Sequence, residues 1–338
     1  MTRHAGIAWC QRSLWGGLSW GVLLLVLLNV SINARSISTS WRNRVAESRM
    51  RARAETWRHC SRDEMAVPFR RNLHYTYIDI CVPPGANSTA FGSWHVFKAG
   101  GSTASQMITR ACDCINGTLL ESFRYRSLEE MEERLGHHPV EFFAAIRDPV
   151  ARFLSAYGEA FRRGSFTKIR SVRRLLAKGE TPRNKIVLLE KILDLFSTAE
   201  QLAAVNDHFL PTVEFLSFAQ PRQPPPPSLR FALDLTKPNA TLKLWDFLSA
   251  RYDLNRSGTC ATPSPAELHD RHRDESYLTA CYPSDRGACI AEEFQKFAPL
   301  FIIRVAELPE RLVGRIRTIY AKDESCYQES ELIARSLV

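Results

Sequence analysis

The stretch that decides the fold is WHVFKAGGSTASQMI, residues 94–108. It begins with an apolar run typical of a buried strand, passes through Lys98 and a pair of glycines, and ends in a helical pattern. The helix is expected to begin at Ser102 or Thr103, which suit an N-cap. Free backbone N–H groups, a positive helix end and a lysine then meet at one point, which predicts an anion-binding loop. The residues expected to contact the anion are Lys98, Ala99, Gly100, Gly101, Ser102 and Thr103.

A second stretch, FFAAIRDPVARFLSAYGEAF at 142–161, has a similar order of features. Its apolar start predicts a strand that delivers Arg147 to the carboxyl edge of a sheet, where α/β folds bind ligands. Asp148 and Pro149 are typical first residues of a helix. Ser155 lies about two turns along that helix, and an arginine fork with a serine hydroxyl suits a phosphate. The stretch predicts a second anion site, although an Arg–Asp pair beside a capped helix would produce the same pattern.

Strand-like and helix-like segments alternate along the chain, which predicts a mainly parallel sheet covered by helices. The expected strands are residues 94–97, 141–146 and 300–305. The expected helices are residues 102–111, a helix starting at Pro149, a helix with its apolar face over 169–176, and residues 186–205. A proline-rich segment at 221–228 is expected to form an irregular surface loop within the domain.

The N-terminal part contains an uncharged apolar run at residues 15–32. As a helix this run would be about 27 Å long, close to the thickness of a thin membrane core. A cleaved signal peptide is the alternative, but the length of the run and the long polar segment after it favour a signal anchor. The arginines just beyond the run do not favour this orientation. We expect a single-pass type II protein with a cytoplasmic tail (1–14), an anchor (15–32), a stem (33–67) and a lumenal domain (68–338).

Sequons and cysteines are typical of a protein of the secretory lumen. Asn-x-Ser/Thr sequons that a lumenal domain would expose begin at Asn87, Asn116, Asn239 and Asn255. Eight cysteines follow the expected anchor, and an even number favours disulfides in an oxidising compartment. Zinc binding is the alternative, but no CxxC pair occurs. Sequence alone leaves the pairing of the cysteines open.

The formal net charge of +9 is concentrated in two stretches, residues 34–60 and 161–190. Such stretches attract polyanions or membrane surfaces, but they also occur as solvated helix faces. The segment 162–185 directly follows the second anion motif. It could line a groove for an anionic glycan, or it could be the outer face of an amphipathic helix.

The two anion motifs together resemble the sulfotransferase superfamily. Residues 94–108 resemble its 5′-phosphosulfate loop, usually written Pro-Lys-Thr-Gly-Gly-Thr, with Phe97 and Ala99 as departures. Residues 142–161 resemble its 3′-phosphate motif, Arg-Asp-Pro followed by Arg and Ser-x-Tyr.

The fuller resemblance is to the membrane-bound Golgi carbohydrate sulfotransferases, and it covers about residues 90–327. NDHFLP at 206–211 is similar to a further segment of that family, and IYAKDESCY at 319–327 is similar to its closing helix, with Tyr320 and Asp323 matching. Only the two anion motifs are specific.

The resemblance implies a P-loop-like fold that uses 3′-phosphoadenosine 5′-phosphosulfate (PAPS). Lys98 and the loop amides would hold the 5′-phosphosulfate, and Arg147 and Ser155 would hold the 3′-phosphate. No metal is expected, because cations of the chain already surround the leaving group. The expected partner is a carbohydrate acceptor, neutral or anionic, at the Golgi membrane, and no nucleic-acid partner is expected.

The acceptor hydroxyl needs a general base, and His208 is the best candidate. Asn206 and Asp207 precede it and could orient its imidazole, although a purely structural contact fits the sequence equally well. His95 is expected to point away from the donor or into the core. Glu159 is an alternative carboxylate base.

Two other functions are compatible with parts of the sequence. A catalytically silent member of the fold would bind glycans without transferring sulfate. A nucleotide kinase would need a lysine after the glycines and a magnesium-binding carboxylate on a strand, and neither is evident.

Overall fold

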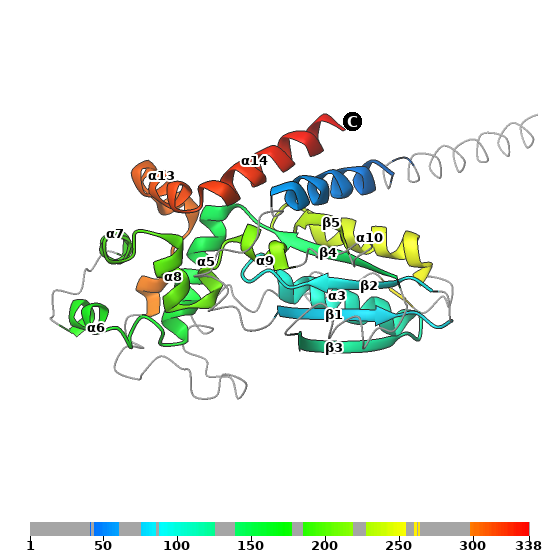
Figure 1. Cartoon of the computed structure of the whole chain (residues 1–338), viewed down its shortest axis with the longest axis horizontal. Helices are drawn as coiled ribbons and strands as arrows, with labels where there is room; N and C mark the ends of the chain where they lie inside the picture. Colours follow the sequence, from blue (N-terminus) through cyan, green and yellow to red (C-terminus); the bar gives the residue numbers. More distant parts are fainter. Residues whose placement is uncertain are drawn as a thin grey trace, which may run out of the picture. The chain divides into compact units, whose positions relative to one another are not determined.

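The structure is an α/β fold with a five-stranded mixed sheet flanked by helices (Figure 1). The α/β class predicted from the sequence is therefore confirmed. The computed structural model describes residues 41, 44–60, 76–85, 88–125, 139–177, 185–218, 228–254, 260, 261, 263 and 298–337.

The sheet has the strand order β3-β1-β2-β4-β5. Strands β2, β4 and β5 are parallel neighbours, whereas β1 pairs antiparallel with both β2 and β3. The prediction of a mainly parallel sheet is thus correct only for these three strands, because β1 and β3 add an antiparallel edge. The strands are β1 (Thr76–Val82), β2 (Ala90–Trp94), β3 (Thr118–Tyr125), β4 (Val140–Ile146) and β5 (Ser228–Asp234).

Helices occupy most of the remaining described chain. The helix of residues 44–60 comes first. The later α-helices are α3 (Gly101–Cys114), α5 (Pro149–Arg162), α6 (Arg170–Ala177), α7 (Lys185–Leu195), α8 (Ala199–Val205), α9 (Thr212–Phe218), α10 (Ala240–Tyr252), α13 (Glu310–Ile319) and α14 (Ala321–Ser336). Short 3-10 helices are η1 (Asp207–Phe209), η4 (Ala298–Phe301) and η5 (Val305–Glu307).

The first expected strand is displaced along the chain. Only Trp94 of residues 94–97 belongs to a strand, because β2 lies upstream of the apolar run. Gly92 sits in this strand where a Cβ atom would come within 2.7 Å of the backbone oxygen of Asp79. The close approach of the neighbouring strand requires glycine there, and glycine weakens the strand signal in the sequence.

The expected strand at 300–305 is wrong, since these residues lie in and between η4 and η5. Their apolar side chains serve helix packing instead: Phe301 stacks on Phe161 of α5 with ring centroids 3.8 Å apart. A short apolar run does not by itself distinguish a strand from other buried backbone.

The long helix expected over 186–205 is two helices, α7 and α8. Thr198 interrupts it by capping α8: its side chain accepts a hydrogen bond from the backbone N–H of Gln201, whose side chain bonds back to the cap. The capping box is a local signal for a new helix start, but the apolar positions of residues 186–205 continue across it and suggested one helix.

Two neighbouring side chains of β4, Phe142 and Phe143, belong to different hydrophobic clusters. Phe142 belongs to the cluster that includes Trp94 and residues of α5, and Phe143 belongs to the cluster formed with α3 and α10. Successive strand residues point to opposite faces, so these clusters lie on the two sides of the sheet.

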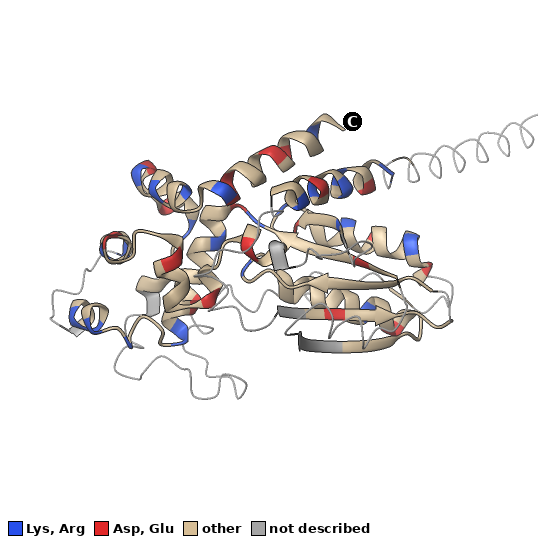
Figure 2. Cartoon of the chain, viewed as in Figure 1, with Lys and Arg blue, Asp and Glu red and all other residues tan. Residues whose placement is uncertain are grey.

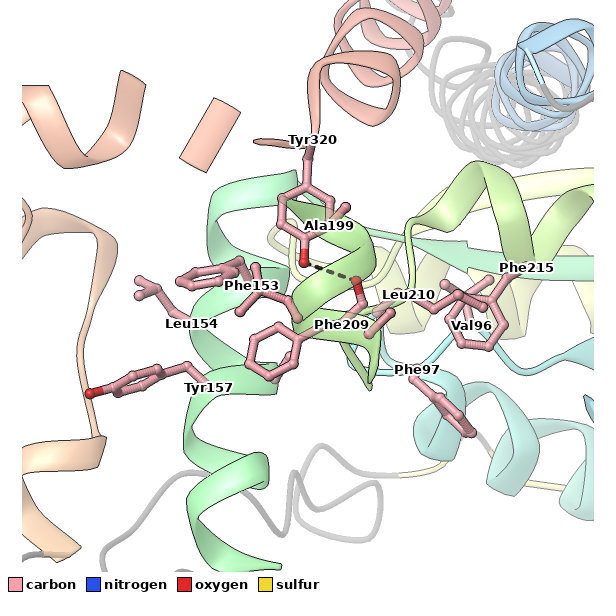
Figure 3. Packing of buried hydrophobic residues seen from close by; sticks show 14 of the residues in the cluster. Val96, Phe97, Phe153, Leu154, Tyr157, Ala199, Phe209, Leu210, Phe215 and Tyr320 are labelled. Atoms are coloured by element: carbon pink, nitrogen blue, oxygen red, sulfur yellow. Dashed lines mark hydrogen bonds between the residues drawn. The ribbon is translucent and has the colours of Figure 1, made fainter. Parts of the chain in front are cut away.

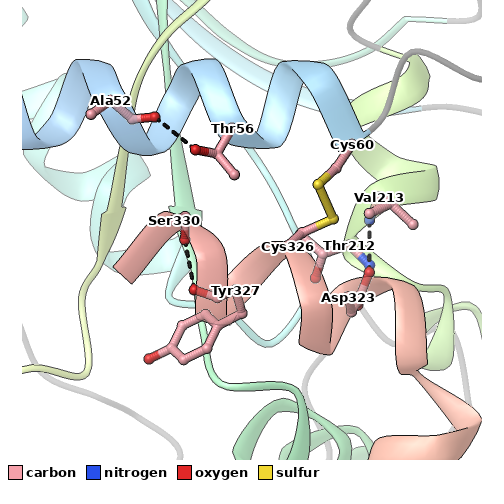
Figure 4. Close-up of a disulfide and its surroundings, with 9 residues drawn as sticks. All are labelled: Ala52, Thr56, Cys60, Thr212, Val213, Asp323, Cys326, Tyr327 and Ser330. Atoms are coloured by element: carbon pink, nitrogen blue, oxygen red, sulfur yellow. Dashed lines mark hydrogen bonds between the residues drawn. A yellow bond between two sulfur atoms is a disulfide. The ribbon is translucent and has the colours of Figure 1, made fainter. Parts of the chain in front are cut away.

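Part of the expected stem belongs to the folded body. In the helix of residues 44–60, Met50, Ala54 and Trp57 are buried, and Cys60 forms a disulfide with Cys326 of α14 (Figure 4). The compact unit begins at Glu47, not near position 68. The sequence concealed this because arginines lie among the buried positions of the same helix.

Six of the eight cysteines form disulfides, as the cysteine count predicted. Besides Cys60–Cys326, the pairs are Cys81–Cys112 and Cys114–Cys260. The other two, Cys281 and Cys289, lie outside the described residues.

The expected tail (1–14) and anchor (15–32) also lie outside the described residues. In the part of the chain that the structure describes, no helix combines the length and the apolar character needed to cross a membrane.

Charged side chains lie mainly on the helices, and the described parts of the strands are largely uncharged (Figure 2). Helix α6 lies in the expected basic segment and is amphipathic: Val172 and Leu176 are buried, whereas Arg173 and Arg174 are exposed. The part of the basic segment that forms α6 is therefore the outer face of an amphipathic helix, one of the two alternatives that the sequence left open.

Replacing both Cys60 and Cys326 with serine is expected to lower the free energy of unfolding by about 2–5 kcal/mol. The disulfide joins residues 266 positions apart, so its loss releases a long loop in the unfolded chain. Denaturant unfolding followed by circular dichroism measures the effect. An unchanged midpoint would contradict it, provided that mass spectrometry confirms the bond in the wild type.

Candidate functional site

The loop between β2 and α3 has the geometry of an anion cradle. Lys98 and Gly100 have positive φ angles of 62° and 99°, and α3 begins at Gly101. The first backbone bond of the helix runs from the N–H of Ala104 to the oxygen of Gly100 at 3.0 Å. The N–H groups of residues 101–103 thus precede the helical hydrogen-bond ladder, where an anion can use them.

The positive φ angle of Gly100 and the close packing around both residues favour glycine at the two positions of the loop. A Cβ atom on Gly100 would lie 3.1 Å from Leu235, and one on Gly101 would lie 2.5 Å from the ring of His95. His95 therefore does not point away from the loop. It lies just after β2, with its ring against the start of α3.

Arg147 joins the two motifs. It follows β4, which is the parallel neighbour of β2, so both motifs leave the sheet at the same edge. Its Nη1 donates to the backbone oxygen of Lys98 at 3.1 Å. Asp148 accepts a hydrogen bond from the N–H of Ala151 and caps α5, with Pro149 at the first helical position, as the sequence predicted.

The side chain of Lys98 lies against α5. Only 9% of it is exposed, and its Nζ is 3.0 Å from Oε2 of Glu159, which is itself 1% exposed. Arg162 donates to both oxygens of Glu159 at 3.0 and 2.6 Å, and Nε of Arg163 donates to Oε1 at 2.5 Å. One buried carboxylate thus gathers three cations.

These contacts make Glu159 a poor base. Burial alone would raise the pKa of its carboxyl group, but Lys98 and Arg162 hold that pKa far below its ordinary value. A carboxylate so stabilised has little tendency to accept a proton. The alternative assignment of Glu159 as the general base therefore does not fit the geometry.

His208 is buried in η1 with a defined ring orientation. Its Nδ1 is 2.6 Å from Oδ1 of Asn206 and 2.9 Å from Oδ1 of Asp207. Both neighbours are acceptors, so Nδ1 carries the hydrogen and Nε2 keeps its lone pair. The backbone N–H of His208 also donates to Asn206 at 3.0 Å, which fixes the amide.

Burial lowers the pKa of His208 below its ordinary value of 6.5; Asp207 opposes this shift, and Lys98 adds to it. The imidazole is therefore neutral at neutral pH, the form in which it can accept a proton.

Phe97 links the anion loop to this histidine. Its ring stacks on His208 with centroids 4.6 Å apart, and it meets Phe215 edge to face at 5.0 Å. In Figure 3 Phe97 and Val96 lie on the same side of the cluster as Phe215. Phe97 thus supplies an aromatic surface against which the imidazole packs.

The C-terminal helices fix the His208 segment from the other side. The hydroxyl of Tyr320 donates to the backbone oxygen of Phe209 at 2.9 Å (Figure 3). Asp323 accepts from the N–H groups of Thr212 and Val213 at 2.7 and 3.0 Å (Figure 4). These buried bonds hold the end of the turn that carries the histidine and the chain that follows it.

Arg152 completes this support from α5. It is 1% exposed, donates to the backbone oxygen of His208 at 3.4 Å and pairs with Asp323 at 3.5 Å. Its role in the structure is to hold the histidine segment.

Ser155 lies between Arg152 and Glu159 on one face of α5, at spacings of three and four residues, and is half-buried. It therefore shares a helix face with the residue that binds Lys98.

The sequence missed the residues that gather around the site from elsewhere. In the sequence, Arg162 and Arg163 were recognised only as part of a basic stretch. No signal in the neighbouring residues indicated that they lie close to Lys98. No family model, curated protein or solved structure gave a significant match to the chain.

Proposed function

We propose that this chain transfers a sulfuryl group from PAPS to a hydroxyl group of a glycan acceptor in the Golgi lumen. The observation that carries the proposal is the meeting of two anion motifs at one sheet edge, where Nη1 of Arg147 lies 3.1 Å from the backbone oxygen of Lys98. A donor with a 5′-phosphosulfate and a 3′-phosphate needs two such sites side by side. The resemblance of both motifs to sulfotransferases supports this donor over others.

The residues fit the two ends of the donor. The amides of residues 101–103 and the ammonium of Lys98 suit the 5′-phosphosulfate, and the guanidinium of Arg147 with the hydroxyl of Ser155 suits the 3′-phosphate. The disulfides support residence in an oxidising compartment such as the secretory lumen.

In the proposed reaction the acceptor oxygen forms a bond to sulfur while the bond between sulfur and the 5′-phosphate oxygen breaks. The hydroxyl proton passes to Nε2 of His208. The electron pair of the broken bond goes to the phosphate oxygen, and 3′-phosphoadenosine 5′-phosphate (PAP) leaves. Lys98 and the loop amides stabilise the charge that develops on this oxygen.

The kinase alternative needs a carboxylate at a strand end, and Asp234 at the end of β5 has that position. Its Oδ1 accepts from the backbone and hydroxyl of Thr236 at 2.9 and 2.6 Å, and its Oδ2 accepts from Tyr327 at 2.7 Å. These bonds favour a structural role. Magnesium-dependent binding of ATP in place of PAP would favour the kinase.

Binding of PAP and of 5′-AMP tests the donor assignment. The wild-type protein is expected to prefer PAP, because only PAP carries the 3′-phosphate. Arg147→Ala should lower the affinity for PAP about 10- to 100-fold, the usual loss when one hydrogen bond to a charged group is removed. Its affinity for 5′-AMP should change little. Isothermal titration calorimetry measures both constants.

Arg335→Ala is a matched control, since Arg335 is exposed on α14. A wild-type protein that binds neither nucleotide, or an Arg147→Ala variant that loses both equally, would contradict the donor assignment.

A further inference from the structure

Glu159 has more partners than a structural ion pair requires. Its Oε2 faces Lys98 at 3.0 Å and Nε of Arg162 at 3.0 Å. Its Oε1 faces Nη2 of Arg162 at 2.6 Å and Nε of Arg163 at 2.5 Å. The two arginines already donate hydrogen bonds to both oxygens of the carboxylate. The contact with Lys98 is therefore not needed to neutralise Glu159.

The contact also fixes the position of the Lys98 ammonium. Lys98 sits in a tight turn with a φ angle of 62°, and its side chain is 9% exposed. A buried ammonium without a counter-ion loses its proton or moves to water. The backbone carbonyl of the same residue is held by Arg147 at 3.1 Å, so both ends of Lys98 are fixed by groups of the site.

We propose that Glu159 is a positioning residue that fixes the ammonium of Lys98 at the anion loop and keeps it charged for the donor's phosphosulfate, an inference that rests on the proposed function. Glu159 can do this without being neutralised itself, because Arg162 and Arg163 hold its carboxylate in the ionised form. It acts through Lys98 and does not itself contact the reacting atoms.

The charges around Lys98 predict the direction in which its pKa changes when Glu159 is replaced. Burial lowers the pKa of Lys98 below 10.5, Glu159 raises it, and Arg163 and Arg162 lower it. Of these four influences, removing the carboxylate leaves burial and the two arginines, and all three lower the pKa of Lys98. Lys98 should then lose its proton at a lower pH, and binding of an anion should weaken at that pH. The charged and titratable groups on the elements around Lys98 include Arg152, Glu159, Arg162 and Arg163 of α5, Asp207 and His208 of η1, His95 before the loop, and Arg147 after β4.

Titration of PAP binding against pH tests the role. Glu159→Gln should lower the affinity for PAP about tenfold at pH 7.5. The pH at which affinity is half lost should fall by about one to three units, the usual effect of removing an opposite charge. In a Lys98→Ala background the same substitution should have no further effect, because the carboxylate acts through the lysine. Additive losses, or tighter binding by Glu159→Gln, would overturn the inference.

Glu159→Asp keeps the buried negative charge but shortens the side chain by one methylene group. It tests the role of Glu159 if the Glu159→Gln variant does not fold. It should retain the wild-type pH dependence of PAP binding but lower kcat about tenfold or more; an unchanged kcat would overturn the inference. Glu329→Gln, on the exposed face of α14, is the control and should match the wild type. A wild-type chain that binds no PAP would remove the proposed function itself, whereas wild-type binding with an unaffected Glu159→Gln variant would remove only the role of Glu159.

Discussion

Lys98→Ala is expected to lower kcat for sulfuryl transfer from PAPS by about 10²–10³-fold, the usual loss when one preorganised group that stabilises the transition state is removed. The ammonium is held in a buried site beside the helix start, where its charge acts at low dielectric. Initial-rate assays with radiolabelled donor and a panel of glycan acceptors measure the effect. The affinity for PAP should fall less than kcat, because charge on the leaving oxygen grows in the transition state.

The variant should remain folded, because Glu159 keeps Arg162 and Arg163 as partners when Lys98 is removed. Lys243→Ala is the matched control: Lys243 is exposed on α10, and its loss should leave kcat unchanged. Transfer by Lys98→Ala within threefold of the wild-type rate would exclude the lysine from the reaction.

Local signals in the sequence predicted the parts of the site that depend on neighbouring residues. The glycine turn, the Asp148 cap and the first residue of α5 all follow from chemistry within four residues. The expected start of α3 at Ser102 or Thr103 is wrong, because the helix begins at Gly101 and its N-cap is Gly100, with no side-chain cap. The orientation of His208 by Asn206 belongs to the same class, since the two residues are two positions apart.

Contacts between distant segments could not be read in this way. Arg147 and Lys98 are 49 positions apart, and Asp323 and Thr212 are 111 apart. Such pairs arise from tertiary packing, which a single sequence does not encode in any local period. The helix of residues 44–60 is a further case, because its arginines suggested a solvated stem while Trp57 and Cys60 tie it to the core.

His208→Gln is expected to lower kcat by about 10²–10⁴-fold, the range for loss of a general base. Glutamine is close to histidine in size and can still bond to Asn206, so the packing against Phe97 should be largely kept. The affinity for PAP should change little, because Lys98 and Arg147 are expected to hold the donor. This separation of kcat from donor affinity distinguishes a base from a residue that merely supports the fold.

The pH dependence gives a second test of the same residue. A base must be neutral to accept the proton, so kcat/KM should rise as pH increases through the pKa of His208 and then level off. Burial lowers that pKa below 6.5, so the half-maximal point should lie below pH 6.5. His208→Gln should remove this limb of the profile, whereas the control His59→Gln, exposed in the helix of residues 44–60, should retain it. A limb that survives in His208→Gln would mean that another group takes the acceptor's proton.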